Sequence, residues 1–146
     1  MICLHILGAT IWVGGHLVVM FSILPETLKN EDASILLGFE KRYEKLGMPS
    51  LFLQIITGLW LAYHLLGMPA NWFGTTPIAH VIQIKLTLLF LTACLAIHAK
   101  TRVIPKLTND SLSQLAWHIR AVSICAILFV LAGASIRFGG YPIFKG

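Results

Sequence analysis

The chain has few charged residues and few cysteines for its length. Only 12% of its 146 residues are Asp, Glu, Lys or Arg, whereas 57% are apolar. Soluble globular domains carry about 25% charged residues, so this composition excludes that class and indicates a small integral membrane protein. No cysteine belongs to a C-x-x-C pair, which argues against a disulfide framework and against a zinc knuckle. The three cysteines lie singly in apolar runs: Cys3, Cys94 and Cys125.

The first 24 residues contain no acid, no lysine and no arginine. They also lack a basic leader and a small-residue cleavage site, and the apolar run is longer than that of a signal peptide. We therefore expect a permanent helix here. The net charge of +5 does not indicate a nucleic-acid partner, because the basic residues lie mainly in connections between apolar segments. That distribution is typical of membrane topology.

Four apolar segments are long enough to cross a bilayer, which takes about 20 residues. We predict spans at about residues 3–24, 48–66, 78–100 and 117–137 within a single domain, residues 1–146. Between the first two spans, apolar residues recur at helical spacing from Ile35 to Leu46, with charged residues on the other face. This pattern predicts a short amphipathic helix at the membrane interface. The expected fold class is an all-α, integral membrane four-helix bundle.

Prolines and capping residues predict where the helices begin and end. We expect Pro25 to end the first helix, Pro49 to open the second span and Pro105 to close the third. The expected caps are Asp32 or Ser34, and Thr76.

Four spans place both termini on the same side of the membrane. The basic residues concentrate in the two connections on the opposite side, which the positive-inside rule makes cytoplasmic. We therefore expect a multi-pass protein of the bacterial inner membrane with both termini outside. The residues that carry this signal are Lys29, Lys41, Arg42, Lys45, Lys100, Arg102 and Lys106.

Histidines inside the first span are the strongest functional signal, because an ionisable residue in a membrane helix is a functional-site hypothesis by default. His5 and His16 are eleven residues apart and therefore share one helix face. Trp12 lies between them on that face, and Gly8 and Gly15 flank it. Small residues beside polar ones allow another helix or a flat ligand to approach the backbone.

Antiparallel helices convert sequence position into depth, so histidines from different spans can be matched. His5 and His64 both fall roughly 10–12 Å above the bilayer centre at 1.5 Å per residue, which predicts a pair in the outer half. A second pair is expected in the inner half, formed by His16 with His98 or His118. In the third span a polar face is expected to point inward, composed of His80, Gln83, Thr87, Cys94 and His98.

Imidazole suits iron, copper and zinc, and axial histidines on facing helices commonly hold haem. The glycines near the histidines favour a flat macrocycle, so one or two haem b groups are the expected cofactor, with copper as the alternative. Lys85 and Arg137 are placed to pair with haem propionates. The metal ligands expected are His5, His64, His16 and His98.

The leading hypothesis is a b-type cytochrome that transfers electrons across or within the membrane. Its expected partners are a quinone or a redox protein, besides the surrounding lipids. So small a chain is expected to form a homo-oligomer or to be a subunit of a larger membrane complex. If it is an enzyme, we expect a membrane oxidoreductase that uses haem b.

Several short motifs resemble the copper-resistance protein D (CopD) family. They are Leu4 to Ala9, Trp12 to Gly15, Thr57-Gly58-Leu59, Trp72-Phe73-Gly74 before Ile84-Lys85-Leu86, and Arg102 to Leu107. The chain is also similar to HemJ-type protoporphyrinogen oxidases in His5, in Glu40 to Pro49, and in Lys85 followed by His98. These resemblances imply a four-helix membrane protein that binds haem or handles copper. His5 would match the HemJ family's haem ligand, and Lys85 its functional lysine; the alternatives implied are copper transport or resistance, and porphyrinogen oxidation.

Overall fold

The computed structural model describes residues 1–107 and 112–140. In these residues every regular element is helical. Four segments are long and apolar enough to cross a membrane: Ile2–Asn30, Ala33–Leu66, Pro77–Lys106 and Leu112–Phe138. The expected all-α membrane bundle is confirmed.

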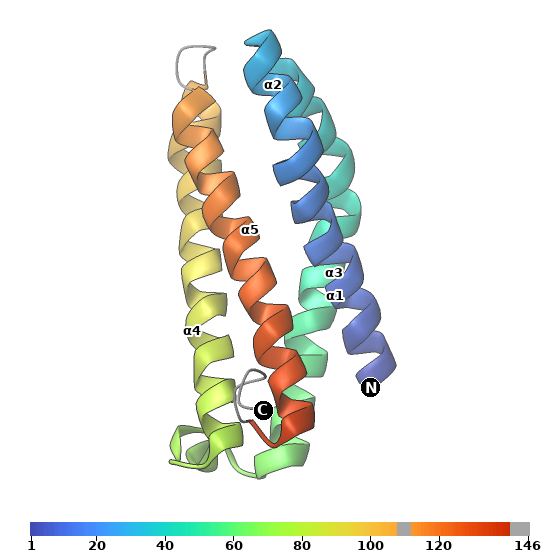
Figure 1. Cartoon of the computed structure of the whole chain (residues 1–146), viewed down its shortest axis with the longest axis vertical. Helices are drawn as coiled ribbons and strands as arrows, with labels where there is room; N and C mark the ends of the chain where they lie inside the picture. The colour runs from blue at the N-terminus through green and yellow to red at the C-terminus, as the bar shows by residue number, and fades with distance from the viewer. Residues whose placement is uncertain (108–111, 141–146) are drawn as a thin grey trace.

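The helices form two antiparallel pairs (Figure 1). Helix α1 (Ile2–Val18) packs along α3 (Ala33–Leu66), and α4 (Pro77–His98) packs along α5 (Leu112–Ser135). Contacts between α1 and α5 join the pairs, whereas α3 and α4 touch little. The short 3-10 helix η2 (Pro69–Phe73) connects α3 to α4.

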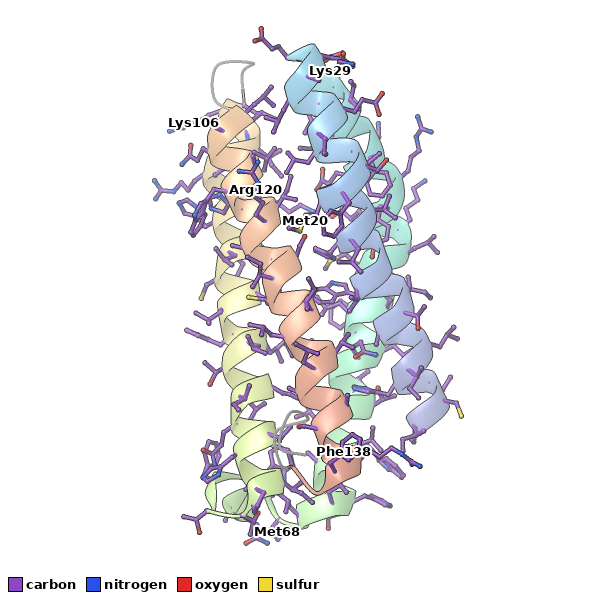
Figure 2. The ribbon with its side chains drawn as sticks, viewed as in Figure 1. Met20, Lys29, Met68, Lys106, Arg120 and Phe138 are labelled. Atoms are coloured by element: carbon purple, nitrogen blue, oxygen red, sulfur yellow. The ribbon has the colours of Figure 1, made fainter. Side chains whose placement is uncertain are left out.

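The helices run up and down, so α1 begins at the end of the bundle where α5 finishes (Figure 1). Lys29 and Lys106 lie at one end of the bundle, and Met68 and Phe138 lie at the other, where the chain also begins (Figure 2). At the Lys106 end a salt bridge between Lys100 and Glu44 links the two pairs. The basic connections therefore share one end, as the topology argument requires.

The first helical segment does not end at Pro25, and that expectation was wrong. After α1 the chain makes one π turn, η1 (Val19–Ile23), and continues as α2 (Leu24–Asn30), which stops where Glu31 adopts a left-handed conformation with φ 50°. Pro25 lies in the first turn of α2, where its missing N–H is tolerated.

The third membrane segment also contains a π turn after its main helix. Thr76 caps α4 as expected, because its hydroxyl accepts from the Ala79 N–H at 3.2 Å. After α4 the chain makes a π turn, η3 (Ala99–Val103), followed by a 3-10 turn, η4 (Ile104–Lys106), which contains Pro105 and ends the segment.

The separate interfacial helix was also predicted wrongly, because α3 is one helix of 34 residues that runs through Pro49. Contacts with α1 hold both halves of α3 in line: Tyr43, before the proline, donates to the Ile11 carbonyl, and Gln54, after it, donates to the His5 carbonyl. The Asp32 cap is confirmed.

The carboxylate of Asp32 caps α3 from the connection that precedes it. It accepts from the Ser34 N–H at 2.9 Å. Hydrogen bonds from Ser34 hold the pKa of Asp32 below its usual range, because they favour the charged form.

The glycines of α1 allow α3 to lie close against it. A Cβ at Gly8 would lie 3.0 Å from Nε2 of Gln54 and 3.2 Å from the Ser50 carbonyl oxygen, and a Cβ at Gly15 would lie 2.0 Å from Cζ of Tyr43. Both glycines therefore accommodate α3 itself. Close approach of another helix is the first of the two alternatives expected for these glycines, and their role beside a flat ligand stays a prediction.

Candidate metal site

His98 and His118 are brought together by the packing of α4 against α5. Nδ1 of His98 lies 2.8 Å from Nε2 of His118, and the two rings are stacked with centroids 5.0 Å apart and planes 12° from parallel. His118 is buried, whereas His98 is exposed at the bundle surface. The sequence placed both residues in the inner half but paired each of them with His16.

The hydrogen positions of this pair follow from its neighbours. Nδ1 of His118 lies 2.9 Å from the Gln114 carbonyl oxygen, which can only accept, so this nitrogen carries a hydrogen. Nε2 of His118 is then an acceptor in the neutral ring, and Nδ1 of His98 donates to it. Nε2 of His98 retains a lone pair that no described residue engages.

This arrangement can bind a metal ion when the hydrogen of His98 moves from Nδ1 to Nε2, because Nδ1 of His98 and Nε2 of His118 then both offer a lone pair from a neutral ring. Metal–imidazole bonds of first-row ions are about 2.0 Å long, so the two nitrogens must separate as the ion enters, and the exposed His98 ring is the one free to turn. His118 stays fixed through Gln114, the kind of support that orients a ligand. No group of three or more potential ligands from His, Cys, Asp and Glu occurs in residues 1–107 and 112–140. Two nitrogen donors alone suit Cu(I), which accepts linear coordination.

His5 is a second oriented imidazole, at the opposite end of the bundle. Its Nδ1 lies 2.8 Å from the Thr57 hydroxyl, and that hydroxyl donates its own hydrogen to the Leu53 carbonyl at 2.5 Å. The hydroxyl oxygen therefore accepts from Nδ1–H of His5, and the lone pair of Nε2 stays free. Gly58 lies against the edge of the ring, since a Cβ there would be 3.2 Å from Cε1 of His5.

His64 lies on the outer surface of α3, although the sequence predicted it on an inward face. Its ring stacks on Trp60, with centroids 3.7 Å apart, and it is exposed. It follows Gly58 by six residues, about 9 Å along the helix, so it lies beyond the turn that His5 contacts. The structure thus brings His5 to Thr57, and the pairing of His5 with His64 stays a prediction that no contact supports.

His16 lies in the interior beside Trp12, with ring centroids 4.5 Å apart. Its Nδ1 donates to the Trp12 carbonyl at 2.8 Å, and the same carbonyl accepts from the Tyr43 hydroxyl at 3.1 Å. Ser123 of α5 donates to the His16 carbonyl at 3.1 Å. His16 is therefore held by α3 and α5, and none of these contacts involves His98 or His118.

The two cations expected near a cofactor lie in different surroundings. Lys85 is partly buried and points at α5, where a Cβ at Gly133 would be 3.4 Å from its Nζ. It also lies within electrostatic range of His5. Arg137 is exposed in the terminal 3-10 turn η6 (Ile136–Phe138).

Sequence reasoning missed two residues that position the histidines. Tyr43 was assigned to the apolar side of an interfacial helix, yet it crosses to α1 and shares the carbonyl that His16 uses. The sequence also predicts an inward polar face on the second span, composed of Ser50, Gln54, Thr57 and His64, and Thr57 was recognised only as a member of it. Ser50 and Thr57 are buried and Gln54 is half-buried, whereas His64 is exposed. A threonine directly before a glycine, facing a histidine of the neighbouring span, is the available signal.

The polar face expected to point inward on α4 instead points outward. Gln83 is half-buried, donating to the Trp72 and Gly74 carbonyls at 3.1 and 2.9 Å. The other four members of this face are exposed: His80, Thr87, Cys94 and His98. The prediction was wrong because α4 has close partners on one side only.

Comparison with known proteins agrees with the CopD resemblance. The family described as CopD, copper resistance protein D, matches residues 37–136. No curated protein and no solved structure matches the chain. The similarity to HemJ-type oxidases stays a prediction. The matched region spans most of α3 and all of α4 and α5, including His98 and His118, and so the chain belongs to the copper resistance protein D family.

Proposed function

We propose that this membrane protein handles copper, taking the ion as cargo at the pair formed by His98 and His118. The observation that carries the proposal is the meeting of two imidazole nitrogens from successive membrane helices at 2.8 Å. Imidazole suits copper, and the family to which the chain belongs is named for copper resistance. His98 receives the ion from the surface, and His118 holds it against α5.

The location of the pair fits exchange of an ion with one side of the membrane. His98 ends α4 and precedes the basic segment that runs to Lys106. The positive-inside rule assigns this end of the bundle to the cytoplasm. His118 follows one helical turn after Gln114 in α5. A copper ion at this pair lies near the membrane boundary, where a soluble carrier can deliver or collect it.

The experiment is a Cu(I) competition titration of the purified full chain against a chromogenic Cu(I) chelator. We expect His98→Ala to weaken binding at least tenfold, which corresponds to about 1.4 kcal/mol. His118→Gln should have a similar effect. The matched control is His64→Ala, because His64 is an exposed histidine on the outer surface of α3 that stacks on Trp60 and has no contact to His118. Equal affinity in all three variants would refute the proposal.

A second candidate is haem b with His5 as an axial ligand, and one observation favours it. Thr57 engages Nδ1 of His5 and leaves Nε2 free, which is how an axial imidazole is oriented. The donor chemistry therefore fits one ligand, and Lys85, which lies within electrostatic range of His5, is the cation that would pair with a propionate. When bound, haem would supply reversible one-electron chemistry, and a quinone or a redox protein would then be the partner.

A pyridine haemochrome assay on the same purified protein separates the two candidates. Stoichiometric haem that is lost in His5→Ala and kept in His98→Ala would favour the cytochrome. Bound copper without haem, lost in His98→Ala and kept in His5→Ala, favours copper handling.

A further inference from the structure

The outer face of α4 carries a row of exposed residues that mixes polar and aliphatic side chains. Six residues recur at alternating intervals of four and three, and every one of them is exposed in the single chain. We call this face the α4 seam, and it consists of His80, Ile84, Thr87, Leu91, Cys94 and His98.

Positions that alternate by four and three residues line one face, and such a face meets a partner along its length when two helices cross with a left-handed twist. The usual crossing of membrane helices has the same hand. Ile84 and Leu91 are the two aliphatic members of the α4 seam, and the other four are His80, Thr87, Cys94 and His98. Histidines in membrane spans almost always face protein or water. The other polar face described above, on α3, is covered by α1. The α4 seam has no such cover from residues 1–107 and 112–140, so a helix from outside the chain is expected on it.

The seam is suited to a second copy of the same chain. Copies share one orientation in the membrane, so a twofold axis along the membrane normal brings each seam residue to its own counterpart at the same depth. The seam is electrostatically self-complementary. It contains no Lys, Arg, Asp or Glu, and Lys85 points away from it toward Gly133. Histidine and threonine side chains can both donate and accept, so each can bond its twin.

The surface along the N-terminal half of the α4 seam is also hollowed. A shallow hollow of about 410 Å³ is lined by His80, Gln83, Ile84, Thr87 and Leu88. Side chains of a facing helix insert into holes of this kind when heptad seams interdigitate.

We propose that two copies of the chain pack in parallel through the α4 seam and that Cys94 and His98 of both copies line one shared copper site. The proposal rests on the proposed function for its metal. Cys94 lies one turn before His98 on the same face, so two facing seams bring two sulfur donors, one from each copy, beside the two His98 imidazoles. Thiolate is a soft ligand that favours Cu(I), and each bound thiol releases its proton to solvent as the ion enters.

The interface is tested by oxidative cross-linking of the full chain in copper-free membranes. In the Cys3→Ala, Cys125→Ala background, Cys94 is the sole thiol. Iodine joins two Cys94 thiols in one disulfide and is reduced to two iodide ions, with release of two protons. We expect a disulfide-linked dimer as the main product.

The matched control is Ala96→Cys in the same background with Cys94→Ala. Ala96 is also exposed, but it lies 200° around the helix from Cys94 and only about 3 Å away in depth. We expect little dimer from this variant. Equal dimer yields from the two positions, a Cys94 variant that stays monomeric, or a Cys94 cross-link to a different protein would each overturn the proposal.

Copper measurements distinguish failure of this inference from failure of the proposed function. We expect one Cu(I) per two chains and at least tenfold weaker binding in Cys94→Ser, with His98→Ala still cross-linking through Cys94. Binding of one ion per chain with no cross-link overturns the dimer and leaves copper handling intact. If the protein cross-links through Cys94 but binds no copper, the shared site and the proposed function are both overturned, and the dimer interface remains supported.

Discussion

The ring of Tyr43 on α3 fills the space that a side chain at Gly15 of α1 would need. A Cβ at position 15 would lie 2.0 Å from Cζ of Tyr43 and 2.2 Å from its hydroxyl oxygen. The hydroxyl donates to the Ile11 carbonyl at 2.8 Å and to the Trp12 carbonyl at 3.1 Å. Because His16 uses the Trp12 carbonyl too, the packing of α1 on α3 also fixes an interior imidazole.

Gly15→Ala should destabilise the bundle by about 1–3 kcal/mol, because the added methyl group forces Tyr43 or α1 to shift. Thermal unfolding in detergent measures this loss. Gly14→Ala is the matched control. A Cβ at Gly14 meets nothing within 4 Å, so alanine there should be neutral or stabilising by up to about 1 kcal/mol through its better helix propensity. Equal losses in the two variants would contradict the packing described.

Thr57→Val should release the His5 ring, because valine keeps the shape of threonine but cannot accept from Nδ1. A half-buried donor left without a partner costs about 1–3 kcal/mol. We expect faster modification of His5 by diethyl pyrocarbonate, measured by mass spectrometry, with the exposed His64 as internal reference. Thr57→Ser keeps the hydroxyl and should restore the slow rate; a fast rate in both variants would argue against the hydrogen bond.

Lys85→Met should stabilise the protein. No described acidic residue pairs with Lys85, since Lys100–Glu44 is the salt bridge found in residues 1–107 and 112–140. A lysine inside a membrane span carries a penalty on the order of 1–3 kcal/mol, and methionine has a similar length without the charge. The melting temperature in detergent should rise. Lys100→Met, at an exposed site, should change the melting temperature little or lower it. A lower melting temperature in Lys85→Met would show that Lys85 has a partner.

Asp32 should make the start of α3 sensitive to acid. Its pKa is lower in the folded protein than in the unfolded chain, so its stabilising effect is present above the unfolded pKa and is lost as the pH falls through the folded pKa. The protection factor of the Ser34 amide against hydrogen exchange should therefore drop at acid pH. Asp32→Asn retains an oxygen acceptor but does not titrate, so a drop of the same size in that variant would exclude the carboxylate as its cause.

Much of the fold could be predicted because each signal is local. Apolar runs of sufficient length define the four spans, and Asp32 and Thr76 cap helices that begin where the sequence indicates. The misplaced boundaries are those at Pro25 and Pro49. In both cases the helix continues through the proline, because a π turn precedes Pro25 and contacts with α1 support α3 on both sides of Pro49.

The candidate site was predicted only in part. The sequence identified His98 and His118 and their common end of the bundle, but it matched them with His16. Position along a helix gives depth, whereas contact also requires the rotation of each helix about its own axis. A rotation error of one residue, about 100°, separates an inward histidine from an outward one, as His64 shows.

The sequence by itself determined that this chain is a four-span helical membrane protein with its basic connections at one end, because hydropathy and charge act along the chain without reference to its neighbours. Only the tertiary structure decided which imidazoles meet and which face lipid. Those contacts depend on how closely α1 and α3 approach at Gly8 and Gly15 and on how α4 turns against α5. Side-chain shape across helices sets both, and no single helix contains that information.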